Sequence, residues 1–436
     1  MSPGLLANAG VGALRAADLT RLQGLRYGAL GAALAFAALP LYVLLPSHYS
    51  GRLGVPLASL GAVLLASRAF DALVDPWLGR LADRALARPR RDATALAGLA
   101  GLLMAAGFAA LFFPPAGSAD HLLAWCAAAL LLTCLGYSGL GVLHQAWGAR
   151  LGGGPALQAR VVAWREGLAL AGVLAASLLP ALAGIPAMVA GACALLVLGL
   201  WALAGAPYGL ARPHLATNAP HGAPTDAWLP WRVTAFRRLM AVFLLNGVAS
   251  AIPATLVLFF IRDRLQVPAW EPAFLGAYFA AAALSMPLWV RAVPRWGLLR
   301  CWLAGMGLAV AAFVWAARLG SGEGVAFALV CLASGAAFGA DLAVPGALLT
   351  GVIRRAGHAQ HHEGQYFGWW TCANKLNLAL AAGLSLPLLQ ALGYSPGSRD
   401  SAALGKLALI YAAVPCLLKG AAAALLWHHR HTLDRP

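Results

Sequence analysis

Three ionisable residues lie within one apolar stretch, residues 55–80, at a spacing that permits ion chemistry. Arg68, Asp71 and Asp75 stand at positions i, i+3 and i+7, which places them on one face of a helix. Two carboxylates one turn apart repel, so at least one is expected to bind a proton unless a cation lies between them. The pattern predicts a site that binds and releases H⁺ or Na⁺.

Lys375 can supply the missing counter-charge. It is one of three lysines in the chain and lies about 11 residues into a second apolar stretch, 364–392, hence about 17 Å into a membrane. Arg165 and Asp341 are expected to line the same cavity. The alternative is that such charges only hold helices together as buried ion pairs, although that role does not need two acids on adjacent turns.

Polar and aromatic residues inside apolar stretches are further candidates for a substrate pocket. A lone His or Asn in a membrane helix more often makes a hydrogen bond to another helix than to a ligand. Proximity in sequence to Lys375 favours the pocket for Trp369 and Trp370, and Lys419 is expected to extend to the aqueous surface. The candidates for the pocket are Arg165, Trp147, Asp341, Thr371, His144, Gln145, Trp370 and Asn246.

A short basic connection follows the charged stretch and contains Gly79, Asp83 and Arg84. One interpretation is that its arginines only hold the loop on the cytoplasmic side. The other is a gating loop, in which Asp83 pairs with arginines or with the end of a neighbouring helix and separates from them during a transport cycle.

The composition indicates that lipid surrounds these elements. Hydrophobic residues make up 61% of the chain and charged residues 11%, against about 25% charged in a soluble domain. Apolar runs of roughly 20 residues recur along the whole length. We expect an all-α membrane protein with twelve spans near 27–49, 55–80, 94–114, 121–148, 157–183, 186–207, 236–261, 270–292, 298–318, 324–350, 364–392 and 403–428.

The distribution of basic residues predicts the orientation. With loops assigned alternately, 21 of the 31 Lys and Arg residues fall on the side of the termini and six on the opposite side. This asymmetry places both termini in the cytoplasm, and it explains the net charge of +16 without a nucleic-acid partner. We expect no removable signal peptide before the first span. The seven cysteines show neither disulfide nor metal-ligand spacing, and we expect no cofactor or metal site.

The chain divides into two similar halves. We expect an N-terminal segment (1–26), a six-helix bundle (27–207), a cytoplasmic linker (208–235), a second six-helix bundle (236–428) and a tail (429–436). The run Asp75–Arg80 at the end of span 2 recurs as Met286–Arg291 at the end of span 8. An even number of spans in each half gives parallel repeats, with a substrate site between them near the midplane.

The run Arg68-Ala-Phe-Asp71-Ala-Leu-Val-Asp75-Pro76-Trp-Leu-Gly79-Arg-Leu-Ala-Asp83-Arg84 resembles the span-2 signature of the glycoside-pentoside-hexuronide:cation symporters, the melibiose-permease branch of the major facilitator superfamily. Leu25–Gly31 and Gly364–Gly368 agree with it. The resemblance implies the major facilitator fold, a monomer and a location in the bacterial cytoplasmic membrane. It also implies a cation site formed by Asp71, Asp75, Arg68 and Lys375. The implied substrate-site residues are Trp147, Arg165 and Thr371.

The chain departs from that family pattern at four positions. Ala33 and Leu143 replace two carboxylates that hold sugar hydroxyls in the sugar-transporting members. Val74 and Leu140 align with polar helpers of Na⁺ binding, which makes a proton the favoured coupling ion over Na⁺. A related branch carries lysophospholipids, so an amphipathic lipid is the alternative to a glycoside or another polar metabolite.

Other functional classes receive less support. An enzyme that modifies lipids needs a nucleophile and base or a metal cluster, and the sequence contains neither a His-Glu-x-x-His motif nor an interfacial Ser/His/Asp set, so we expect no enzyme. A membrane receptor or scaffold remains open. The sequence thus predicts a secondary transporter whose partners are membrane lipids and one small-molecule or lipid-like substrate.

Overall fold

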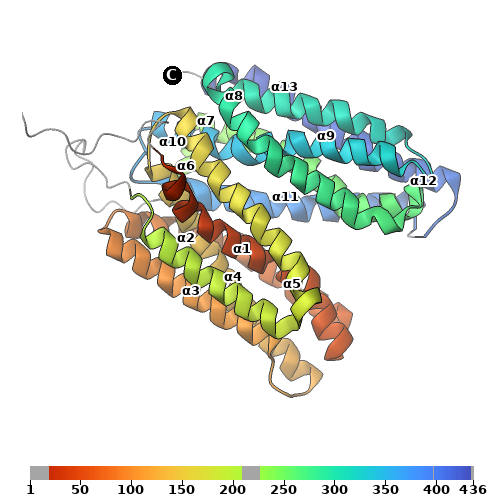
Figure 1. The fold of residues 1–436 in the computed structure, drawn as a ribbon, viewed down its shortest axis with the longest axis horizontal. Helices are drawn as coiled ribbons and strands as arrows, with labels where there is room; N and C mark the ends of the chain where they lie inside the picture. The colour runs from red at the N-terminus through yellow and green to blue at the C-terminus, as the bar shows by residue number, and fades with distance from the viewer. Residues whose placement is uncertain (1–18, 209–225, 396, 434–436) are drawn as a thin grey trace, which may run out of the picture.

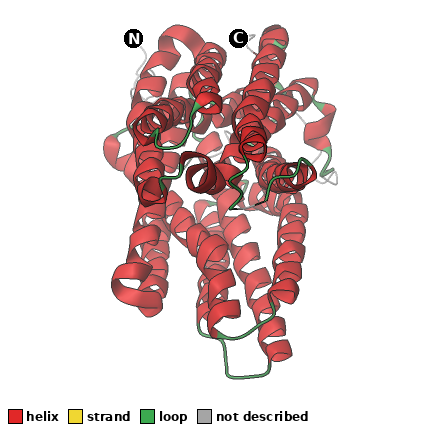
Figure 2. Ribbon diagram, turned by 90° about the vertical axis from the view of Figure 1, so that its right-hand side faces the viewer, coloured by secondary structure: helices red, strands yellow, loops and turns green. Residues whose placement is uncertain are grey.

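The computed structural model describes residues 19–208, 226–395 and 397–433, and every regular element in these ranges is a helix (Figure 2). Most of the expected linker, 208–235, lies outside them. Ten helical segments of the described chain are long and apolar enough to cross a membrane. The helix that carries Arg68, Asp71 and Asp75, α2, is not among these ten segments. Residues Pro268–Arg318 form one segment, although two spans are expected there. An all-helical membrane fold is confirmed, while twelve crossings remain an expectation.

The first half contains five long helices. Their bounds, with one short π-helix, are α1 Arg21–Ser47, η1 His48–Arg52, α2 Leu57–Leu86, α3 Arg90–Phe112, α4 Ala119–Arg150 and α5 Pro155–Ala204. Local signals set their starts. Thr20 and Gln23 form a capping box before α1, and Pro155 occupies the first turn of α5, where its missing N–H costs nothing.

The second half is more interrupted. Its elements are α6 Leu229–Arg232, α7 Thr234–Phe259, η3 Phe260–Leu265, η4 Pro268–Trp270, α8 Glu271–Phe313, η5 Val314–Arg318, α9 Gly324–Ala343, α10 Pro345–Arg355, α11 Glu363–Ala391, α12 Ser401–Ala408, η6 Leu409–Ala413, α13 Val414–His428 and α14 Arg430–Leu433. The expected span 324–350 is divided at Val344, because Pro345 has no N–H to continue the helix.

Two glycines break the longest helices. Gly184 in α5 has a φ of 80°, and Gly297 in α8 has a φ of 77°. Glycine adopts such angles without the clash that a Cβ would cause. The expected spans 157–183 and 186–207 meet at the first break, and 270–292 and 298–318 meet at the second. Each glycine lets the chain turn back without a loop.

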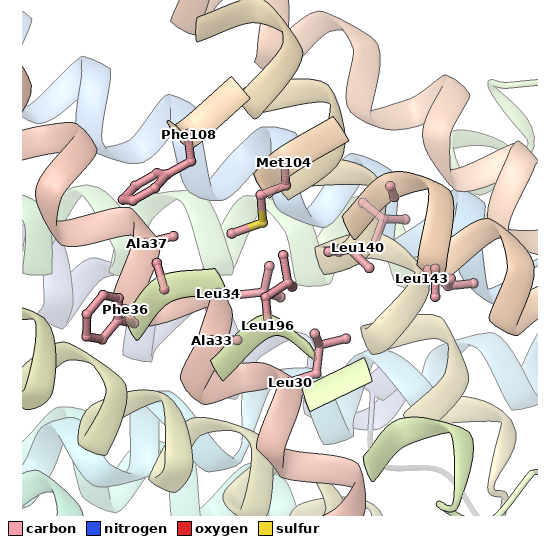
Figure 3. Packing of buried hydrophobic residues seen from close by; sticks show 14 of the residues in the cluster. Leu30, Ala33, Leu34, Phe36, Ala37, Met104, Phe108, Leu140, Leu143 and Leu196 are labelled. Atoms are coloured by element: carbon pink, nitrogen blue, oxygen red, sulfur yellow. The ribbon is translucent and has the colours of Figure 1, made fainter. Parts of the chain in front are cut away.

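The hydrophobic core falls into separate clusters. One consists of residues between Leu19 and Ala206, and the two others consist almost wholly of residues after Trp231. Figure 3 shows Ala33 and Leu143 inside the first cluster, near Leu30 and Leu140. The two apolar replacements are therefore packed core residues, exposed by 1% and 0%.

The two groups of helices meet at one end of the molecule (Figure 1). We call this the linker end; it contains the start of α1, the α2–α3 and α10–α11 connections, and α6. The opposite end, with η1 and α12, is called the far end, and there α5 and α9 diverge. Helix α2 of the first half packs on α11 of the second. Gly79 and Gly364 lie in this contact, and a Cβ on either would overlap the other's backbone.

Candidate functional site

Lys375 of α11 lies between the two acids of α2. Its Nζ is 2.7 Å from Asp71 Oδ2 and 2.9 Å from Asp75 Oδ1, and it also donates to Ser138 Oγ of α4 at 2.7 Å. The Ser138 hydroxyl donates in turn to Asp71 Oδ1 at 2.6 Å. The cation that the spacing of the acids requires is thus a side chain of the other half.

The acids of this ion-pair group differ in their access to solvent. The side chain of Asp75 is fully buried, whereas those of Asp71 and Lys375 are 11% and 17% exposed. Asp75 Oδ2 accepts no hydrogen bond from the described residues. Arg68 is exposed and lines, together with Asp71, a cavity of about 40 Å³ between α1, α2 and α4. The cavity gives the group room for one small ion or water.

A second charged group connects the two halves at the linker end. Asp83 at the end of α2 accepts the backbone N–H groups of Gly364 and Gln365 at 2.7 and 2.9 Å. Arg150 at the end of α4 donates to Asp83 at 3.2 Å and to Glu363 at 3.1 Å. None of the three charged side chains is more than 6% exposed. The N–H groups of the first turn of α11, which have no partner within the helix, therefore bind a carboxylate from the other half.

Histidines lie beside this charged group, in the connection before α11. His358 Nδ1 is 2.8 Å from the Tyr366 hydroxyl, and the rings of His358 and His362 are 5.3 Å apart. Burial lowers the pKa of His362 to about 4, and the neighbouring positive charges of His358, His361 and Arg150 act in the same direction. Burial also lowers the pKa of His358. Neutral imidazoles are thus favoured here.

Arg165 has a partner next to it in the chain. Its Nη2 donates to Glu166 Oε1 at 2.6 Å, and its side chain is 14% exposed. His144 is buried and lies 2.7 Å from the carbonyl of Tyr27 through its Nε2. Gln145 of α4 donates to the Thr371 hydroxyl of α11 at 3.2 Å. Of the expected pocket residues, Gln145 and Thr371 are therefore joined across the halves.

Asp341 and Asn246 belong to a different group, inside the second half. Asp341 accepts from Asn246 at 3.1 Å, from Trp302 Nε1 at 2.8 Å and from Lys419 Nζ at 2.8 Å. The expectation that Lys419 extends to the aqueous surface is wrong, since its side chain is 9% exposed. The ammonium pairs with the Asp341 carboxylate, which would otherwise be buried without a counter-charge.

The tryptophans lie away from the ion-pair group. Trp147 is 1% exposed, and its Nε1 donates to the Pro207 carbonyl at 2.7 Å. Trp370 stacks on Phe243, with ring centroids 3.6 Å apart. Trp369 donates to the Ala227 carbonyl just before α6. In this conformation the first of them anchors the end of α5, and the last anchors the described part of the linker just before α6.

Sequence reasoning missed several members of these groups. The sequence gives no signal for Ser138 or Glu363. Arg150 is one of the 21 basic residues on the side of the termini, and its sequence context predicts only the orientation in the membrane. Gly79 lies in the α2–α11 contact, while Arg84 is exposed beside it. Among the described residues, no three His, Cys, Asp or Glu side chains form a group that could hold a metal ion.

Comparisons with known proteins identify the family and the fold. A family model described as MFS/sugar transport protein matches residues 24–435. A comparison with curated protein sequences finds no significant match.

Several solved structures share the fold. An outward-facing bacterial homologue of the iron transporter ferroportin superposes with a TM-score of 0.68 at 16% identity, covering 94% of this chain and 99% of that one. The Escherichia coli fucose:proton symporter gives 0.63 at 15% identity, covering 91% and 97%. A proton:xylose symporter of the major facilitator superfamily bound to 6-bromo-6-deoxy-D-glucose gives 0.63 at 14%, covering 93% and 94%. At these identities the likeness shows the fold alone.

Proposed function

Because the chain belongs to the MFS/sugar transport protein family, we propose that it is a cation-coupled secondary transporter that works by symport and alternating access. Membership of this family places the chain among transporters and not among enzymes. The proposal includes twelve crossings, a bacterial cytoplasmic membrane and a linker end that faces the cytoplasm. The asymmetry of basic residues supports this orientation.

The observation that carries the proposal is the position of Lys375 between Asp71 and Asp75. The lysine belongs to one half and the acids to the other, so their ion pairs connect the halves. A cation that binds the acids competes with the ammonium for the same oxygens. Binding of the ion therefore weakens the connection between halves, which links the ion to the conformational change.

A proton suits this site better than Na⁺. Na⁺ needs several oxygen ligands, and apart from the two acids the group offers the Ser138 hydroxyl and the Asp71 carbonyl, both already near Lys375. Leu140 is fully buried, and its side chain has no oxygen that could bind Na⁺. A proton needs only one carboxylate oxygen, and Asp75 Oδ2 has no hydrogen-bond donor among the described residues.

The contacts at the linker end support an outward-facing state. Arg150, Asp83 and Glu363 connect the halves there, and Arg354 of α10 donates to the Gly153 carbonyl at 2.8 Å. We assign Gly79, Asp83 and Arg84 to a gate that is closed in this state. It opens when the ion-loaded transporter turns inward.

The solute is a small polar metabolite such as a glycoside, bound between the halves near Gln145, Thr371 and Arg165. The description of the family favours a sugar-like solute. The packed Ala33 and Leu143 favour the second candidate, a lysophospholipid, because neither presents a carboxylate to sugar hydroxyls.

Uptake into proteoliposomes tests the coupling. We expect Asp75→Asn to abolish accumulation against a gradient of solute while the protein still inserts and folds. Asp120→Asn, on an exposed residue of the α3–α4 end, is the control and should transport normally. Undiminished gradient-driven uptake by Asp75→Asn would refute the mechanism. A screen of sugars, lysolipids and organic acids at several pH values, with and without Na⁺, identifies the solute and the ion.

A further inference from the structure

A cavity of about 230 Å³ lies entirely within the second half of the molecule. Its lining comes from α7, α8, α9, η6 and α13, and the ion-pair group of Lys375 contributes nothing to it. Aromatic rings form much of the wall; Tyr278 and Phe338 are stacked with centroids 5.4 Å apart. The ring-bearing lining residues are Phe274, Tyr278, Phe279, Phe313, Phe338 and Tyr411. Such a wall accommodates an apolar, ring-sized group.

One part of the cavity wall is charged. Lys419 Nζ lies 2.8 Å from Asp341 Oδ2 and 3.0 Å from Ser250 Oγ, and all three residues line the cavity. Asn246 and Trp302 donate hydrogen bonds to Asp341 but do not line the cavity. They therefore position the carboxylate without occupying the space for a ligand. The cavity thus presents an ammonium, a carboxylate and a hydroxyl side by side.

The pair restricts the charge of a ligand. A ligand with a single negative charge that binds Lys419 draws the ammonium from Asp341 and leaves that carboxylate unpaired inside the membrane. A ligand with a single positive charge leaves Lys419 unpaired in the same way. Both outcomes are costly, because a buried charge without a partner pays its full desolvation penalty. A ligand that carries both charges pairs with both residues.

We propose that this cavity binds an apolar zwitterion, of which an α-amino acid with an aromatic or large aliphatic side chain is the simplest example. Its carboxylate accepts hydrogen bonds from Lys419 and Ser250. Its ammonium donates to Asp341 and lies near aromatic faces, which attract cations. Its side chain fills the aromatic part of the cavity. This binding does not depend on the coupling role of Asp71 and Asp75.

Binding is measured on the purified full-length chain in nanodiscs by isothermal titration calorimetry. The probes share one ring and differ in charge: L-phenylalanine carries both charges, 3-phenylpropanoate only the negative and phenethylamine only the positive. We expect L-phenylalanine to bind at least tenfold more tightly than either of the others. Equal binding of all three would show an apolar cavity without charge recognition, and preference for a singly charged probe, or no binding of L-phenylalanine, would also overturn the proposal.

Substitutions locate the site. Ala309→Phe places a ring in the cavity, leaves both residues of the charged pair in the chain, and should abolish binding of L-phenylalanine. Ala280→Phe, on an exposed position of the same helix α8, should leave it unchanged. Because a single charge change leaves an unpaired buried charge, the charge test uses the double variant Asp341→Asn with Lys419→Met. It should lose the preference for the zwitterion over the singly charged probes; a retained preference would place the site elsewhere.

Discussion

The Asp83 carboxylate of α2 accepts the backbone N–H of Gly364, at 2.7 Å, in the first turn of α11. The two residues are 281 positions apart and belong to different halves. A charge at the end of one helix therefore neutralises the positive end of another. This contact, with Arg150 and Glu363 beside it, connects the two halves at the linker end.

The close approach of α2 and α11 depends on glycine. Gly79→Ala places a methyl group against the Gly364 carbonyl, so the helices must separate at the linker end. We expect a cysteine introduced at the buried Gln365, next to Gly364, to react a few fold faster with a membrane-impermeant maleimide added on the linker side. Gly61→Ala, in the same helix but facing open space, should not change the labelling. Equal labelling of both variants would contradict the role of Gly79.

Arg150 balances two buried carboxylates at once. Arg150→Met leaves Asp83 and Glu363 without their cation, and we expect a loss of about 3–5 kcal/mol of stability. Arg232→Met, which breaks the exposed pair with Asp226, should cost about 1 kcal/mol or less. Thermal unfolding in detergent measures both. Arg150→Lys should fall between them, because lysine restores the charge but not the fork of donors.

Lys375 lies between the carboxylates of Asp71 and Asp75, where the proposed coupling ion would bind. In Lys375→Met the carboxylates of Asp71 and Asp75 face each other without an ammonium, so an added cation should stabilise the protein. Na⁺ at tenfold its dissociation constant would contribute about 1.4 kcal/mol. The melting temperature in NaCl and in choline chloride, at pH 5 and pH 8, measures the effect. Lys406→Met, which changes an exposed residue at the far end, is the control. If the melting temperature of Lys375→Met changed with neither Na⁺ nor pH, the prediction would be contradicted.

His362 should make the closed linker end sensitive to acid. Its pKa is lowered by burial to about 4, from 6.5 for an exposed histidine. Between these values the unfolded chain binds more protons than the folded one, so stability falls as the pH drops through this range. His362→Gln should flatten the dependence of melting temperature on pH between 6.5 and 4. His121→Gln, on an exposed residue near the far end, should leave the slope as it is.

Much of the fold follows from local sequence. Runs of apolar residues predict membrane helices wherever they occur, because each span satisfies its own backbone hydrogen bonds. The helix breaks at Gly184 and Gly297 lie where the sequence predicts that consecutive spans meet. The spacing of Asp71 and Asp75 indicates by itself that the pair needs either a bound proton or a cation between the acids. These inferences depend on neighbours within one or two helical turns.

Only the tertiary structure decided which distant residues are partners. The sequence indicated that each buried charge needs a counter-charge, but several were available, and the choice depends on how the helices cross. Lys375 reaches Asp71 and Asp75 because α11 packs on α2, and Lys419 reaches Asp341 because α13 packs inside the second half. Hydropathy and spacing show which charges are buried and therefore need a partner. The packing of helices that are far apart in the chain decides which side chains face each other.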